Sequence, residues 1–266
     1  MAYTTGTGTM AFLFAGPRPR HSAAIALAVA LSWLVPQQVD AQEGSADFFF
    51  GAPRGWISVR CGWLIPRAES DLYDFVSDQL TIEPSDFQSG TFNTELGVAL
   101  RPSVSIEGGL DVSRRSFASE YRHFISSDGT PIAQRTKLDQ TGLFVGVRFT
   151  PTAYGRRISR FAFIHDRVVP YLGGGLSASD YAFQQAGQFV DFITLAVFSD
   201  SFRTDGWAFG PYVRAGSDLQ VWRRLYVNLD ARYTWQHAPT LSSDFTGFDG
   251  IDLSGFRGTT GISVVF

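Results

Sequence analysis

The stretch Thr91–Ser113 reads TFNTELGVALRPSVSIEGGLDVS, and its side chains alternate between apolar types and small or polar types. Between residues 92 and 100 every second residue but one is apolar, and the alternation resumes at Val104 after a turn around Pro102. A two-residue period is typical of a β-strand with one apolar face. The stretch therefore predicts a β-hairpin whose two strands are each about ten residues long.

The residues opposite the apolar face separate a membrane barrel from a soluble sandwich. They are glycines, serines and charged residues such as Glu95, Glu107 and Asp111. A transmembrane barrel turns apolar side chains outward to lipid and small or polar ones inward. Strands of about nine to eleven residues cross a bilayer, whereas strands of globular proteins average about five or six. A soluble lipocalin-like barrel is the rival fold, and it would turn the bulky apolar residues inward.

The same alternation recurs along the chain. We expect eight strands, over residues 55–65, 91–101, 104–113, 138–150, 168–180, 207–219, 225–237 and 255–266. Short links near residues 102 and 222–224 alternate with long links over 66–90, 114–137, 181–206 and 238–254. This asymmetry predicts an all-β fold, an eight-stranded antiparallel up-and-down transmembrane β-barrel.

One link departs from the pattern of short and long connections. Residues 151–167 should form a short turn, yet the segment is long and carries Arg156, Arg157 and Arg160. We expect a short helix or another excursion there.

The N-terminal region has the features of an export signal. Arg18, Arg20 and His21 precede an apolar run over residues 23–35, and Val39–Ala41 resembles a cleavage site. The run is shorter than the roughly 20 residues that span a bilayer as a helix. We predict a signal peptide over residues 1–41, a short N-terminal segment over 42–53 and an outer-membrane barrel domain over 54–266.

Composition excludes some classes of function. The net charge is −3 and no basic run occurs, so we expect no nucleic-acid partner. Cys61 is the single cysteine, which precludes an internal disulfide. We also expect no cofactor and no metal, because His123, His165 and His237 show no metal-ligand spacing.

The inward-facing charges are the candidate site. An eight-stranded barrel is just wide enough for side chains to fill it, and buried charges must be paired. We expect a salt-bridged polar network in the lumen, with Arg101 on the same inner face. The network residues are Arg60, Glu95, Glu107, Asp111, Arg148, Arg214, Asp230 and Arg232. A narrow water or ion path is the alternative, and we do not expect a general solute pore because open channels come with about 16 strands.

Aromatic residues near the strand ends suggest an interfacial girdle. The candidates are Trp56, Trp63, Tyr171, Trp207, Trp222, Tyr226, Tyr233 and Trp235. The apolar loop over residues 188–198 is unusual for a surface segment. It could extend the strands, cap the barrel or contact a ligand or partner.

An enzyme is the least favoured interpretation. His237 is followed by Ser242, Ser243 and Asp244, which could form a lipid-hydrolysing site. Serine and aspartate are common in loops, so we predict that the protein is not an enzyme.

Several strands resemble a known family. The stretches PYLGGGL (170–176), GPYVRAG (210–216) and LDARY (229–233) resemble strands of small outer-membrane β-barrels, the OmpA-like transmembrane domain. The terminal Phe266 resembles the assembly signal of such barrels. The resemblance implies an outer-membrane location, contact with outer-membrane lipid, insertion by the barrel assembly machinery and a monomeric state.

That family is functionally diverse, so membership says more about location than about activity. We predict a mainly structural barrel with surface-exposed loops. The alternatives are a narrow channel or a transport module for a small hydrophobic ligand, and then a lipid-modifying hydrolase.

Overall fold

The computed structural model describes residues 52–159, 163–239 and 241–266. The predicted signal peptide over residues 1–41 and nearly all of the predicted segment over 42–53 lie outside the described residues.

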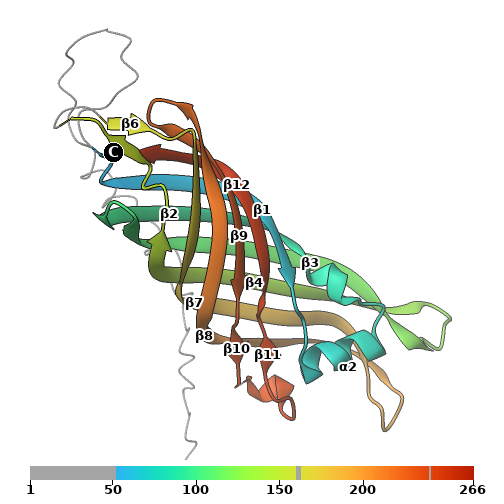
Figure 1. The fold of residues 1–266 in the computed structure, drawn as a ribbon. Helices are drawn as coiled ribbons and strands as arrows, with labels where there is room; N and C mark the ends of the chain where they lie inside the picture. Colours follow the sequence, from blue (N-terminus) through green and yellow to red (C-terminus); the bar gives the residue numbers. More distant parts are fainter. Residues whose placement is uncertain (1–51, 160–162, 240) are drawn as a thin grey trace, which may run out of the picture. The chain divides into compact units, whose positions relative to one another are not determined.

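Eight long strands form one closed antiparallel ring (Figure 1). They are β1 (Gly55–Pro66), β2 (Ser89–Arg101), β3 (Val104–Ile125), β4 (Pro131–Phe149), β7 (Val168–Val190), β8 (Val197–Trp222), β9 (Leu225–Thr234) and β12 (Gly255–Val265). Each strand pairs with the next along the chain, and β1 pairs with β12 to close the ring. The predicted eight-stranded up-and-down barrel is confirmed.

Shorter elements lie at the two ends of the barrel (Figure 1). The loop end carries α2 (Asp71–Gln79), two 3-10 turns (Pro84–Phe87 and Ser243–Phe245), β10 (His237–Ala238) and β11 (Ile251–Asp252). The turn end carries the Pro102 turn, the chain's C-terminus and a hairpin of β5 (Gly155–Arg157) and β6 (Phe163–His165). The excursion expected over residues 151–167 is this hairpin and not a helix.

The outer face of the wall changes character along each long strand. On β4 the outward side chains from Leu143 to Phe149 are apolar and exposed. Further toward the loop end, the outward positions of β4 hold Asp139, Lys137 and Arg135. On β8 the same boundary falls between Trp207 and Asp205. An apolar band bordered by charged residues matches the surface that a bilayer requires.

Two expected loops are largely strand. β3 and β4 continue to a turn over residues 126–130, and β7 and β8 continue to a turn over 191–196. The strand-extension alternative for the apolar segment 188–198 therefore matches the structure. Beyond the apolar band the outward positions are mostly polar or alanine, so the contrast between the two faces that reveals a strand in the sequence weakens there.

A hydrophobic cluster fills the loop end of the barrel. Leu72, Tyr73 and Val76 of α2 are buried in it together with Leu138 and Phe183 from the strand walls. An isolated helix of nine residues is marginal in water, so this packing holds α2 in place. Asp71 and Asp74 in its first turn add a favourable interaction with the helix dipole.

A smaller aromatic cluster lies at the turn end. Trp56 and Tyr226 from the wall pack with Tyr154 and Phe163 from the β5–β6 region. Among the described residues, no helix is long and apolar enough to cross a membrane.

Candidate functional site

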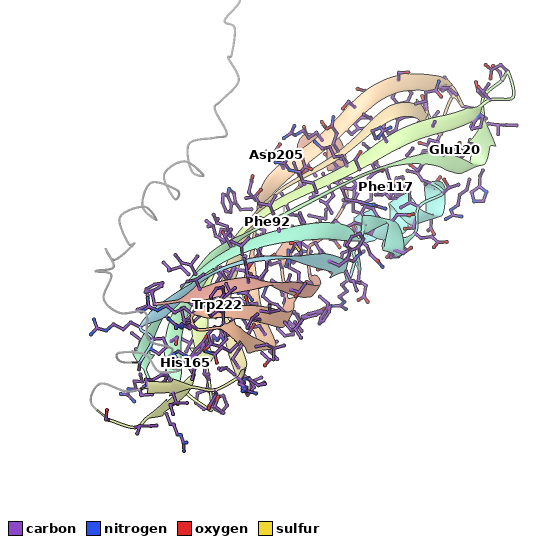
Figure 2. All side chains as sticks on the ribbon, turned by 90° about the horizontal axis from the view of Figure 1, so that it is seen from above. Phe92, Phe117, Glu120, His165, Asp205 and Trp222 are labelled. Atoms are coloured by element: carbon purple, nitrogen blue, oxygen red, sulfur yellow. The ribbon has the colours of Figure 1, made fainter. Side chains whose placement is uncertain are left out.

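Ten charged side chains of the eight wall strands point into the lumen between the two apolar clusters. Successive side chains of a strand point to opposite faces, so these residues alternate with the lipid-facing ones. Among the described residues, the ten are Arg60, Arg148, Arg214, Arg232, Arg257, Glu95, Glu107, Asp111, Asp218 and Asp230. Five arginines and five carboxylates balance in charge. Figure 2 shows how densely side chains fill the barrel.

Glu95 is the centre of this lumen network. Its Oε2 accepts hydrogen bonds from Arg60 and, at 2.5 Å, from Arg214. Its Oε1 accepts the indole N–H of Trp56 at 2.9 Å. The carboxylate is fully buried, so removal of either arginine would leave it with an incomplete set of partners.

Arg214 connects carboxylates from three strands. Besides Glu95 on β2, its guanidinium lies 3.0 Å from Glu107 on β3 and 2.8 Å from Asp230 on β9. Tyr171 donates its hydroxyl to Asp230 at 2.8 Å. These contacts cross the lumen, so they fix the spacing of opposite walls.

One ion pair extends the network toward each end. Toward the turn end, Arg148 pairs with Asp218 and lies 3.5 Å from the ring centroid of Tyr171. Toward the loop end, Arg232 pairs with Asp111. Both arginines are buried, so their charges are compensated where water does not reach them.

The structure brings the eight sequence-derived candidates into one lumen. The sequence reasoning missed Asp218 and Arg257, although the period-two phase places both on the inner face. Asp218 is four residues after Arg214 on the same strand, and Arg257 alternates with the outward Phe256. Arg257 donates to Gln140 and Thr234 at 3.3 and 3.4 Å.

Arg101 was expected on the inner face, and this prediction is wrong. The side chain is exposed at the end of β2. The register between β2 and β3 shifts between Ala99 and Arg101 at the Pro102 turn, which breaks the alternation there.

Three of the expected girdle aromatics lie inside the barrel. Trp56, Tyr171 and Tyr226 are buried. Trp56 packs over Gly97, and Tyr171 packs over Gly216 of the neighbouring strand, where no side chain competes for the space. The other five aromatics face outward at least in part, and they are Trp63, Trp207, Trp222, Tyr233 and Trp235.

Two residues of the hydrolase hypothesis form hydrogen bonds that do not involve His237. Ser242 donates its hydroxyl to the carbonyl of Arg203 at 2.6 Å, and Asp244 accepts the backbone N–H of Arg203 at 3.2 Å. These bonds tie the loop to β8, and none of them joins His237. Within the part of the chain that the structure describes, no group of three metal-binding side chains occurs.

The β5–β6 region is anchored to the turn end of the wall. Tyr154 donates its hydroxyl to Asp218 at 2.8 Å, and His165 Nδ1 lies 2.7 Å from the hydroxyl of Tyr226. Burial and the nearby Arg224 lower the pKa of His165 to about 4, so the imidazole is neutral at pH 7.

The closed ring, the apolar outer band and the polar lumen define the class of protein: a small β-barrel of the outer-membrane type. No family model matches the sequence, and no curated protein matches it either.

Solved outer-membrane proteins have a similar arrangement of strands. OprG from Pseudomonas aeruginosa is 11% identical, with 82% of this chain and 99% of that chain covered and a TM-score of 0.47. A major outer membrane protein from Thermus thermophilus is 10% identical over 81% and 100% of the two chains, with a TM-score of 0.43. The outer membrane protease OmpT from Escherichia coli is 11% identical over 85% and 100%, with a TM-score of 0.39. At these identities the likeness concerns the fold alone.

Proposed function

We propose that the protein is an integral outer-membrane barrel with a mainly structural role and a closed lumen. The observation that carries this proposal is the lumen network. Five arginines and five carboxylates fill the space that a solute would need, between an apolar cluster at each end. An eight-stranded barrel leaves no further room once its interior side chains are packed.

The proposed orientation places the turn end in the periplasm and the loop end at the cell surface. Bacterial barrels have short periplasmic turns and longer extracellular connections. The C-terminus and the Pro102 turn lie at the turn end, whereas α2 and the long β3–β4 and β7–β8 hairpins lie at the loop end. The outward positions of those hairpins next to the apolar band, such as Arg135, Lys137 and Asp205, are charged, which suits exposure to water.

Export and insertion belong to the same proposal. The signal peptide over residues 1–41 would direct export to the periplasm and be cleaved, and the barrel assembly machinery would insert the chain as a monomer. Phe266 supports a role as the assembly signal through its position, because its carbonyl accepts N–H groups of Arg54 and Gly55 at 2.6 and 3.1 Å. The terminal residue thus lies at the seam between the first and the last strand.

We further propose that the barrel has no enzymatic activity. The hydrogen bonds of Ser242 and Asp244 lead away from His237, which supports the proposal.

The test is single-channel recording with the purified protein in planar bilayers. We expect no discrete openings from the wild type. A variant with residues 70–88 replaced by a short glycine–serine linker lacks the loop-end cap and serves to show whether the network alone closes the lumen. Discrete openings of the wild type would overturn the structural proposal and favour the narrow channel. Heat-modifiable migration on gels verifies that each sample is folded.

A further inference from the structure

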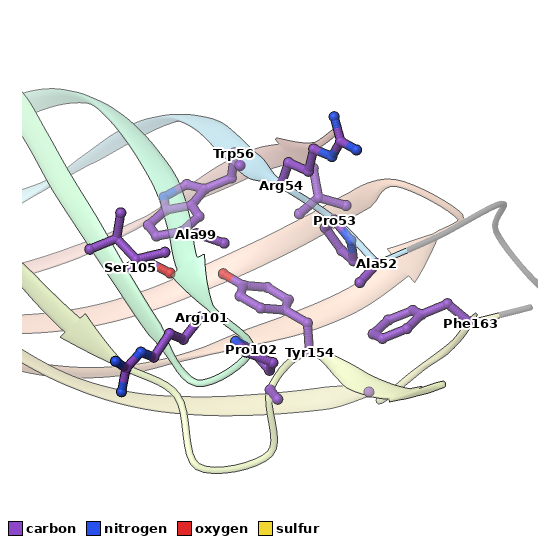
Figure 3. A pocket seen from close by; sticks show the side chains of 15 residues that line it. Ala52, Pro53, Arg54, Trp56, Ala99, Arg101, Pro102, Ser105, Tyr154 and Phe163 are labelled. Carbon is purple, nitrogen blue, oxygen red and sulfur yellow. The ribbon is translucent and has the colours of Figure 1, made fainter. Parts of the chain in front are cut away.

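The turn end contains a cavity that the lumen network does not use. Its volume is about 420 Å³, within the range of roughly 300–1,000 Å³ that small-molecule sites occupy. Figure 3 shows the side chains that line the cavity, with Tyr154 and Pro102 near the centre of the group. Trp56, Tyr154, Phe163 and Val265 form its apolar lining.

The indole N–H of Trp56 and the hydroxyl of Tyr154 are polar groups of the lining, and both already form hydrogen bonds. The Trp56 indole N–H donates to Glu95, and the Tyr154 hydroxyl donates to Asp218. Both bonds tie these groups to the lumen network, so neither polar group is left without a partner at the cavity wall. The interior therefore suits a hydrocarbon group and offers little to a polar one.

The rim of the cavity is cationic. Arg54 and Arg101 are exposed and belong to the lining, and no carboxylate does among the described residues. Figure 3 shows the two arginines on opposite sides of Tyr154, with both guanidinium groups pointing outward. A negative head group outside the cavity could pair with either guanidinium group.

The cavity also borders the surface that faces lipid. Leu100 lines it and is 61% exposed on the outer apolar band. A molecule dissolved in the inner leaflet would reach the mouth without crossing water. The apolar interior suits a hydrocarbon chain, and the cationic rim suits a negative charge. Since the cavity also borders the lipid, the ligand that fits is an amphiphile with one chain and one negative charge.

We propose that this cavity is a binding site for a long-chain carboxylate, a fatty acid supplied from the lipid that surrounds the turn end. The acyl chain lies along the apolar lining, and the carboxylate lies at the rim, where it pairs with Arg54 or Arg101. The proposal does not depend on whether the lumen conducts.

The test uses quenching of Trp56 fluorescence in lipid nanodiscs. The protein carries phenylalanine at positions 63, 207, 222 and 235, so that Trp56 is the only tryptophan left in the described barrel. The probe is dodecanoate brominated on its last carbon, and the matched probe is the equivalent brominated dodecanol, which lacks the charge. We expect saturable quenching by the carboxylate and weaker quenching by the alcohol.

Three variants test whether the carboxylate binds in this cavity. The double variant Arg54→Gln, Arg101→Gln should bind the carboxylate about tenfold more weakly, because it loses the charge-assisted contacts. Ala99→Phe, which fills the cavity, should abolish saturable quenching. Arg223→Gln removes an exposed arginine from another turn of the same end and should leave binding unchanged.

Three outcomes would overturn the proposal. One is quenching that does not saturate, and another is equal quenching by acid and alcohol that the double variant leaves unaltered. The third is saturable quenching only after deletion of residues 44–51, because the chain's own Phe48–Phe50, which precede the lining residue Ala52, would then be the occupant. Heat-modifiability is checked for every variant, and a variant that does not fold is replaced by Arg54→Lys or by Ala99→Leu.

Discussion

Trp56 donates its indole N–H to Glu95 at 2.9 Å from the adjacent strand, inside the barrel. The ring can occupy this position because it lies over Gly97, the residue of β2 that pairs with it. The same side chain therefore closes the turn-end cluster and completes the set of partners around the central carboxylate.

Substitution of that glycine should displace the tryptophan. A Cβ atom at Gly97 would lie 2.1 Å from the Trp56 ring, so Gly97→Ala must move the ring and weaken its bond to Glu95. We expect a destabilisation of about 1–3 kcal/mol, the usual cost of overpacking. Urea-dependent folding in detergent micelles measures it. Gly90→Ala on the same strand is the control, because its nearest neighbour would be 3.9 Å away. Equal effects at both positions would contradict the prediction.

Loss of the central carboxylate, Glu95, should lower the free energy of unfolding several times more than loss of an exposed carboxylate. Glu95→Ala leaves Arg60 and Arg214 buried without their shared partner, and breaking a buried pair costs about 3–5 kcal/mol. The same folding assay applies. Glu69→Ala removes a carboxylate whose pairing with Arg67 is exposed, and it should change stability very little. If Glu95→Ala has the same urea midpoint as the wild type, water replaces the carboxylate as the partner of the two arginines.

The loop-end cap should open when its buried contact is removed. Leu72→Ala creates a cavity in the cluster under α2, where such truncations cost about 2–5 kcal/mol. Amide exchange across residues 71–79 should accelerate while exchange in the wall strands stays slow. Asp78 lies on the exposed side of the same helix, so Asp78→Ala tests whether any change in the helix sequence accelerates exchange without loss of a buried contact. Unchanged exchange in the Leu72 variant would mean that α2 is held by other contacts.

The apolar band should be sensitive to charge in a way that depends on position along β4. Val145→Arg lies in the middle of the band and should cost about 2–4 kcal/mol, whereas Thr141→Arg lies at its border and should cost about 0–1 kcal/mol. Refolding into vesicles at graded urea concentrations compares the two. If both variants behave alike, the band does not mark the bilayer.

The β5–β6 anchor should weaken in acid. The pKa of His165 is lowered from 6.5 to about 4, so in this range the unfolded segment binds more protons than the folded one. The stability of the anchor is therefore full above about pH 6.5 and falls as the pH falls toward 4. Limited proteolysis of residues 151–167 as a function of pH follows it. His165→Gln should remove the dependence, and persistence of the dependence in that variant would assign it to another group.

The sequence predicted the parts of the fold that depend on local alternation. Eight strands and the inward position of Arg60 or Glu107 follow from a two-residue period. The partners of these residues do not, because Arg214 reaches Glu95 across 119 residues and only the closure of the ring decides which strands meet. The inward position of Trp56 depends on a glycine of the next strand, which a single strand does not reveal. The length of β3 and β7 was missed because their outer faces become polar beyond the apolar band.

The equal numbers of arginines and carboxylates in the lumen have an electrical consequence. The work of a membrane potential is the sum over all charges that move along the field, so it cancels when equal positive and negative charges move together. The ten lumen side chains carry no net charge, so displacing them together along the barrel axis would transfer none. A movement of the whole network along the barrel axis is therefore expected to respond equally to either polarity of an applied voltage.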